Sequence, residues 1–313
     1  MQLLVVNFHY FREKKTKKGI FPLTLRDFEY QIEIISKYYD FVSEDEIIEN
    51  LKKGRKISKN SCLLTFDDGL KEQMKVANLL IKKGIPGMFY VSSESIKNNI
   101  VLDVHKLHFI KSILPEKDLY NFLCEMHDLK SYPFNQKSLK NQYRYDNDIA
   151  RKIKFYMNFV LTEKERKNTI NYFFQRFVNS EKDFAKNLYM SYNDLKKIAK
   201  HSMLGTHSKS HVPLGNLSEQ EIEKEISDSI LDINKIVGEK KVRSISYPYG
   251  GISAVTNKVA HIAEKCNLEF GLTMWRGIND LKNLDNKFLL NRIDTNDAPG
   301  GKFNSSDYIL NRV

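Results

Sequence analysis

Cysteine is scarce in this 313-residue chain, and its three cysteines form no recognisable motif. Cys62, Cys124 and Cys266 are odd in number and widely spaced, and no CxxC pair is present. Such a set predicts neither a disulfide framework nor a thiolate zinc site. Because Cys62 stands beside an apolar run, we expect it to be a small buried hydrophobic residue.

Long apolar runs are also missing. No stretch of about 18 apolar residues occurs, so we expect no transmembrane helix. The apolar residues Leu3–Val6 are followed at once by asparagine. They lack the basic region and the long apolar region of a secretion signal. The sequence therefore predicts a soluble, cytoplasmic protein.

Acidic residues are outnumbered by basic ones, 39 against 50, which gives a net charge of +11. This balance favours anionic partners such as phosphorylated carriers, membrane surfaces or nucleic acid. A lysine-rich proteome gives the same excess without any partner. Because no recognised nucleic-acid-binding module accompanies the charge, we expect no nucleic-acid partner.

Apolar strands alternate with amphipathic helices along most of the chain, which implies an α/β fold with parallel strands. The glycine fingerprint of dinucleotide-binding sheets is missing, so the pattern favours a barrel-like closure. Capping boxes at Ser43 and Ser218 mark the starts of two helices. Strands are predicted at 3–8, 41–42, 63–66, 87–91, 203–205, 242–247, 270–273 and 289–293.

Glycine disappears between residues 95 and 188, where tyrosine, phenylalanine, lysine and asparagine dominate. Helical spacing at Leu107, Ile110 and Leu114, and again from Ile170 to Phe177, predicts a helical insertion at 95–188. The barrel would then comprise residues 1–94 and 189–313. The insertion could cap a site or hold an acceptor chain, but aromatic residues at helical spacing are more typical of a core.

Two adjacent carboxylates, Asp67 and Asp68, follow the predicted strand at 63–66. Neighbouring side chains of a strand point to opposite faces. The conformational freedom of Gly69 nevertheless lets the carboxylates of Asp67 and Asp68 turn toward the same site. One carboxylate can then bind a cation while the other moves protons. The alternative is that both merely cap the following helix.

His207 and His211 also follow a predicted strand, and Gly205 and Pro213 argue against a long helix there. A tight loop can bring both imidazoles to one point. Two imidazoles and one carboxylate leave coordination positions open for water, as in catalytic zinc sites and related divalent-metal sites. (β/α) barrels place their sites after strands. Structural histidines in the core or at the surface are the alternative.

Three segments, Thr65–Gly69, His207–His211 and Tyr247–Gly250, resemble in order the first three motifs of the NodB-homology polysaccharide deacetylases, carbohydrate esterase family four. The resemblance covers about residues 60–95 and 190–295. It implies a distorted (β/α) barrel of the polysaccharide deacetylase type with a helical insertion. It also implies a hydrolase that uses a divalent metal, Zn²⁺ above all, to remove N- or O-acetyl groups from sugars.

Matching positions imply the role of each site residue. Asp67 resembles the general base, and Asp68, His207 and His211 resemble the metal ligands. Tyr249 resembles the residue whose backbone N–H helps to hold the oxyanion. The metal would polarise the acetyl carbonyl and lower the pKa of bound water, and Asp67 would take the proton.

The sequence departs from the family pattern at two points. Many members carry an arginine that supports the base where Ser246 stands here, and Arg243 or Arg292 could replace it. The histidine general acid of the last motif is missing from Leu289–Ile293. A related branch, the exported poly-N-acetylglucosamine deacetylases, presents such a histidine from an N-terminal strand. His9 resembles that arrangement, so our hypothesis is that His9 protonates the leaving amine.

Substrate contacts are expected from Tyr249, Trp275, Arg276 and Arg292, which all follow predicted strands or lie at their ends. The sequence thus predicts a metal-dependent N-deacetylase of an acetylated amino sugar in surface-polysaccharide biosynthesis. Without an export signal, the substrate would be a nucleotide- or lipid-linked sugar in the cytoplasm. Two alternatives are a deformylase or amidase with the same site, and a catalytically silent carbohydrate-binding relative.

Overall fold

The chain folds into two compact units, each described here by itself. The computed structural model describes residues 2–14, 20–53, 60–129, 140, 146–238, 241–304 and 308. The first unit comprises Met1–Lys15, Pro22–Ile100 and Lys182–Val313, and the second comprises Thr16–Phe21 and Val101–Glu181. The division at 95 and 188 expected from the sequence stays a prediction. Among the described residues, no helix is both long and apolar enough to span a bilayer.

The first unit is built on one parallel sheet whose strands run in the order β7-β6-β5-β4-β3-β1-β8, with β2 paired to β3. Neighbouring strands pair in parallel, as in β1 with β3, where Phe8 lies opposite Phe66. Parallel pairing follows from the helices between successive strands. The strands are β1 (Leu3–Phe8), β2 (Asp40–Phe41), β3 (Ser61–Phe66), β4 (Met88–Val91), β5 (Leu204–Thr206), β6 (Ser244–Ser246), β7 (Phe270–Leu272) and β8 (Ile293–Asp294).

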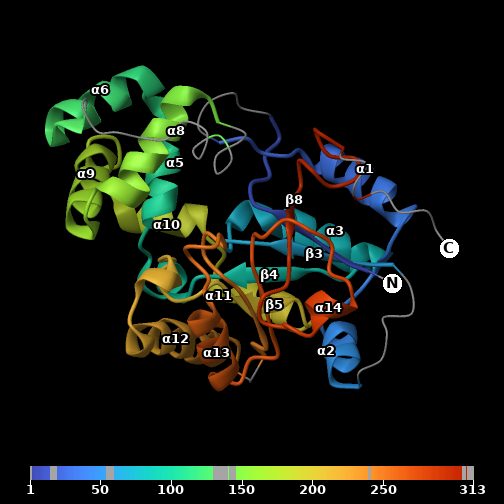
Figure 1. The fold of residues 1–313 in the computed structure, drawn as a ribbon. Helices are drawn as coiled ribbons and strands as arrows, with labels where there is room; N and C mark the ends of the chain where they lie inside the picture. Colours follow the sequence, from blue (N-terminus) through green and yellow to red (C-terminus); the bar gives the residue numbers. More distant parts are fainter. Residues whose placement is uncertain are drawn as a thin grey trace. The chain divides into compact units, whose positions relative to one another are not determined.

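The segment from Leu290 to Asp294 curls this sheet toward closure. The main-chain N–H of Leu290 donates to the carbonyl of Gly271 next to β7 (3.0 Å). Ile293 then pairs with Val6 of β1. The predicted strand at 289–293 was therefore wrong in extent, since Leu290 forms an isolated bridge and β8 begins only at Ile293. The predicted distorted (β/α) barrel is confirmed (Figure 1).

Helices surround this sheet in the first unit, and Figure 1 shows α12 and α13 side by side. The predicted capping boxes at Ser43 and Ser218 are confirmed. The helix expected from Leu70 begins instead with a 3-10 turn, η1 (Lys71–Gln73). The other helices are α1 (Leu25–Ser36), α2 (Glu44–Lys53), α3 (Met74–Lys83), α4 (Ser93–Asn98), α10 (Glu181–Leu188), α11 (Tyr192–Ala199), η4 (Leu214–Asn216), α12 (Glu219–Val237), α13 (Asn257–Lys265) and α14 (Leu281–Leu284).

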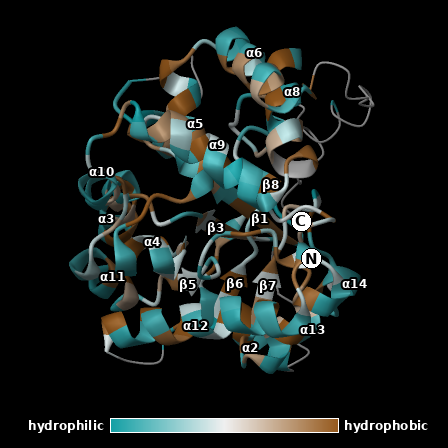
Figure 2. Ribbon diagram, turned by 90° about the vertical axis from the view of Figure 1, so that its left-hand side faces the viewer, coloured by the Kyte–Doolittle hydropathy of each residue, from teal (hydrophilic) through white to brown (hydrophobic). Residues whose placement is uncertain are grey.

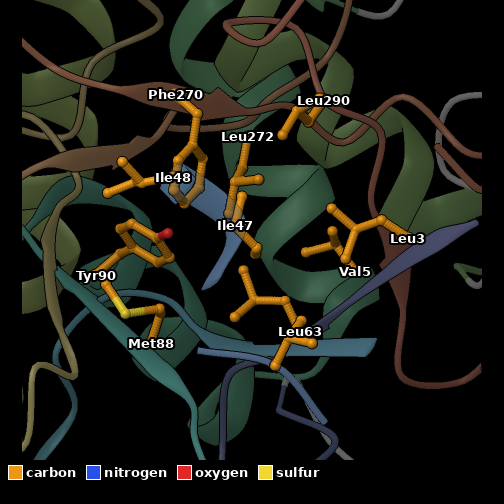
Figure 3. Close-up of a cluster of buried hydrophobic side chains, with 11 residues drawn as sticks. Leu3, Val5, Ile47, Ile48, Leu63, Met88, Tyr90, Phe270, Leu272 and Leu290 are labelled. Atoms are coloured by element: carbon orange, nitrogen blue, oxygen red, sulfur yellow. The ribbon is translucent and has the colours of Figure 1, made fainter. Parts of the chain in front are cut away.

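A hydrophobic cluster fills the inner face of the curled sheet (Figure 3). Val5 of β1 and Leu63 of β3 meet Ile47 of α2 there, and all three are buried. Because side chains alternate along a strand, the series that faces this cluster from β3 continues through Thr65 to Asp67. The apolar core thus fixes the inward direction of the first polar side chain beyond β3.

A carboxylate lies buried at the start of α2. Glu44 accepts hydrogen bonds from Arg243 Nη2 (2.7 Å) and Ser244 Oγ (2.5 Å). Burial raises the pKa of Glu44 to about 7, although the bonds from Ser244 and Arg243 oppose the shift. The native state therefore holds a proton on this carboxyl at pH values where the unfolded chain has lost it.

The Glu44 carboxyl is expected to weaken the fold as the pH rises. Between its unfolded pKa near 4.5 and its folded pKa of about 7, the native state binds more protons, so stability falls as the pH rises. Replacing Glu44 with glutamine should remove a loss of up to about 3 kcal/mol over this range. Urea unfolding of the wild type and of Glu44→Gln at pH 4.5 and pH 7.5 measures the free energy of unfolding of each protein. If the difference in this free energy between the two proteins is the same at both pH values, the prediction is contradicted.

The second unit is helical over its described residues. Ile170 and Phe174 are buried, as expected of a core. Phe177, expected on the same buried face, is 46% exposed because α9 ends at Gln175. Its helices are α5 (Asp103–Ile113), α6 (Glu116–His127), α8 (Asp148–Phe155), the π-helix η3 (Tyr156–Val160) and α9 (Glu163–Gln175).

Candidate metal and catalytic site

A tight turn after β3 presents Asp67 and Asp68. Asp68 has a φ of 78° and Gly69 a φ of 64°, so the backbone is left-handed at two successive residues. A Cβ on Gly69 would lie 2.7 Å from Val91, so only glycine fits there. The turn breaks the alternation of the strand, and both buried carboxylates reach the site. A left-handed aspartate is strained, and such strain is concentrated at functional sites.

A second turn, after β5, presents His207 and His211. No helix forms between them, and both Ser208 and His211 have positive φ, 58° and 59°. The two rings lie 4.9 Å apart between centroids. The predicted loop is confirmed, and it carries both imidazoles to Asp68.

Asp68, His207 and His211 are spaced as ligands of one metal ion. Asp68 Oδ1 lies 3.5 Å from His207 Nε2 and 3.3 Å from His211 Nε2. Ligands about 2.0–2.2 Å from a tetrahedral zinc ion lie roughly 3.4 Å from one another. The Nδ1 of His207 is hydrogen-bonded to the carbonyl of Ser246 (2.6 Å), which leaves Nε2 as the nitrogen that could bind a metal ion. These residues fit a divalent ion, and one carboxylate with two imidazoles suits zinc.

Helix α12 contacts the loop between His207 and His211. Glu225 accepts from the N–H of Ser210 (2.9 Å) and from its Oγ (2.7 Å), next to His211. Lys209 pairs with Asp228 (2.7 Å) one turn along the helix. Figure 2 shows hydrophilic and hydrophobic segments alternating along α12. Polar residues of α12 thus hold the loop that carries His207 and His211.

Replacing Glu225 with alanine is expected to weaken Zn²⁺ binding about 10- to 100-fold, because loss of a residue that orients a ligand has effects of that size. Glu223→Ala is the control, since Glu223 is exposed on the same helix. Competition with a chromogenic chelator measures both affinities. Equal affinities in the two variants would show that the contact to Ser210 does not hold the loop.

Arg292 supports Asp67 from the closing segment of the barrel. Its Nη1 lies 3.0 Å from Asp67 Oδ1 and 2.9 Å from Oδ2, and its Nε donates to the carbonyl of Thr273 (2.8 Å). Burial raises the pKa of Asp67, but the charge of Arg292, with those of two histidines, lowers it more. The net pKa lies below its usual value, so Asp67 is ionised and can accept a proton.

Arg292 therefore stands where the sequence left a choice between two arginines. Arg243 instead pairs with Glu44 and Asp45 at α2. The side chain of Arg292 is fully buried, and this burial corrects the expectation that it contacts substrate. Its contacts with Thr273 and Asp67 hold the guanidinium group in place beside the Asp67 carboxylate.

His9 follows β1 directly and stands beside Asp67. The N–H of Asp67 donates to the carbonyl of Phe8 (3.1 Å), so the ends of β1 and β3 are in register. The charge of His9 is among those that lower the pKa of Asp67. His9 is half-buried, so it combines proximity to Asp67 with access to solvent.

The residues expected to contact substrate differ in exposure. Tyr249 has a φ of 61° and is 38% exposed, and its ring lies 5.2 Å from that of His211. Trp275 is half-buried. The side chain of Arg276 is 40% exposed, with Nε 3.9 Å from buried Asp297. No motif in the sequence pointed to Asp297.

Comparison with known proteins places these motifs in context. Residues 157–271 match the family model described as polysaccharide deacetylase; this range holds both histidines and Tyr249 but not the two aspartates. No curated protein matches the chain.

Similar solved structures cover nearly the whole chain. The Streptococcus pyogenes deacetylase PplD, solved with acetate, has a TM-score of 0.60 at 15% identity and covers 99% of each chain. IcaB from Ammonifex degensii has a TM-score of 0.56 at 13% identity, covering 96% of this chain and 94% of its own. A de-N-acetylase from Aggregatibacter actinomycetemcomitans has a TM-score of 0.53 at 12% identity, covering 94% of each. At these identities the structures show a shared fold.

Proposed function

We propose that this chain, whose residues 157–271 match the polysaccharide deacetylase family model, is a metal-dependent hydrolase that removes an N-acetyl group from an amino sugar. The observation that carries the proposal is the convergence of Asp68, His207 and His211 beside a base, Asp67, that is held ionised. The similar structure named as a de-N-acetylase supports the choice of an amide substrate.

The chemistry divides among these residues. A bound divalent metal, held by Asp68, His207 and His211, would supply a Lewis acid for the acetyl carbonyl and for water. Asp67 accepts a proton as the water oxygen bonds to the acetyl carbon. The backbone N–H of Tyr249 helps to hold the oxyanion. The C–N bond then breaks, His9 gives its proton to the amine nitrogen, and acetate leaves.

The basic surface supports a phosphorylated carrier as part of the substrate. The net charge of +11 attracts anions, and a nucleotide- or lipid-linked amino sugar carries phosphate. A cytoplasmic location, a role in surface-polysaccharide biosynthesis and Zn²⁺ as the ion used in the cell belong to the same proposal.

Acetate release from the zinc-loaded protein tests the function. UDP-N-acetylglucosamine and short N-acetylated oligosaccharides are the substrates, with N-formylated amides alongside. We expect acetate from the sugars and its loss after chelation. Formate release from the N-formylated amides alone would favour a deformylase, and sugar binding without product would favour a silent relative. Activity on extracellular polymer alone would remove the support for a carrier-linked substrate.

His9 as general acid makes a separate prediction. The variant His9→Ala should lose about 10²- to 10⁴-fold in turnover, the usual contribution of a positioned acid, and should keep its full metal content. His201→Ala is the control, because His201 is exposed and is assigned no role. Near-normal turnover of His9→Ala with full metal content would rule out the acid role.

A further inference from the structure

One buried side chain, Gln73, joins the carboxyl ends of β1 and β3. Its Nε2 donates to the main-chain carbonyl of Asp67 (2.6 Å) and to that of His9 (2.8 Å). A carbonyl can only accept, so the two contacts fix which end of the amide is the nitrogen. One NH₂ group therefore uses both of its protons to bridge the two strand ends.

The scaffold holds this amide in place. Gln73 is fully buried in η1, and its own N–H donates to the carbonyl of Leu70 (3.0 Å). Helix α3 continues from it, with Val76 and Leu80 buried in the core. The bridge is thus anchored at both of its ends, in the helix and in the strands.

A glutamine is not the residue that stability alone would favour here. Its Oε1 is buried and has no hydrogen-bond partner among the described residues, and a buried acceptor without a partner destabilises the folded state. An apolar side chain of similar length would avoid that cost. An apolar side chain could not donate the two hydrogen bonds to the carbonyls of Asp67 and His9.

The two bridged carbonyls belong to the residues that exchange protons with substrate in the proposed function. We propose that Gln73 is a positioning residue that sets the spacing between the base, Asp67, and the acid, His9. This inference rests on the proposed function. Small displacements of groups that act together in a transition state lower turnover strongly. The proposed reaction needs Asp67 and His9 at the same substrate amide. The distance between these two side chains therefore matters for turnover.

The variant Gln73→Met removes both donors and keeps the length of the side chain. We expect kcat for acetate release from an N-acetylglucosamine oligosaccharide to fall about 10- to 100-fold, with KM and zinc stoichiometry unchanged. In a His9→Ala background the same change should have little further effect, because the spacing no longer serves an acid. Gln31→Met is the matched control, since Gln31 is also buried and donates to a carbonyl, that of Thr295 (2.7 Å).

Hydrogen exchange supplies a readout that does not depend on turnover. Peptides covering 3–10 and 61–68 should exchange faster in Gln73→Met than in the wild type or in Gln31→Met. Unchanged exchange at both strand ends would overturn the bridge. Independent kcat losses for Gln73→Met and His9→Ala would overturn the positioning role even if exchange is faster. If the wild-type protein releases no acetate, the catalytic role falls with the proposed function, while exchange still decides whether Gln73 joins the strands.

Discussion

Replacing Asp67 with asparagine is expected to lower turnover about 10²- to 10⁴-fold, the contribution of a positioned base, while the metal site stays loaded. Asparagine keeps the shape of the side chain but cannot accept the proton from water. Asp68, His207 and His211 are untouched, so zinc stoichiometry should remain that of the wild type. Steady-state acetate release and metal analysis on the same sample measure both quantities.

The Asp67→Asn variant leaves the buried Arg292 without its counter-charge, and an uncompensated buried charge costs about 3–5 kcal/mol. The double variant Asp67→Asn with Arg292→Gln removes that charge and serves as the folded control. It should be more stable than the single variant and equally inactive. Turnover within about tenfold of wild type in a folded, loaded variant would show that another group accepts the proton.

Replacing His207 with alanine is expected to abolish activity by a different route, through the loss of the metal. First-contact ligands matter more than the residues that orient them, so we expect Zn²⁺ affinity to fall by more than about 100-fold. His201→Ala is again the control. Chelator competition gives the affinity, and circular dichroism confirms the fold.

The two histidine variants also separate the roles of the site. His9→Ala should lose turnover and keep zinc, whereas His207→Ala should lose both. Full zinc affinity in His207→Ala would place the metal elsewhere and would contradict the ligand set of Asp68, His207 and His211.

Much of this arrangement follows from short stretches of sequence. The strand before Asp67 and the loop between His207 and His211 are local features, set by an apolar run, a glycine and a proline. Local composition predicted them because each depends on neighbours in the chain. The barrel followed from the alternation of strands and helices.

Contacts between distant residues could not be predicted in the same way. Arg292 and Asp67 are 225 residues apart in the chain, and only the closure of the barrel between β7 and β1 brings them together. Gln73 and Glu225 lie on helices whose polar residues look like solvated ones in a sequence. Nothing in a side chain's type shows which backbone group it will meet.

The proposed deacetylase activity depends on one divalent ion held by Asp68, His207 and His211. Acetate release measured while Zn²⁺ is added to metal-stripped protein tests it most directly. We expect release to rise with added zinc and to reach a plateau at one equivalent. Release that is complete before any metal is added, or absent when one equivalent is bound at these three residues, would contradict it.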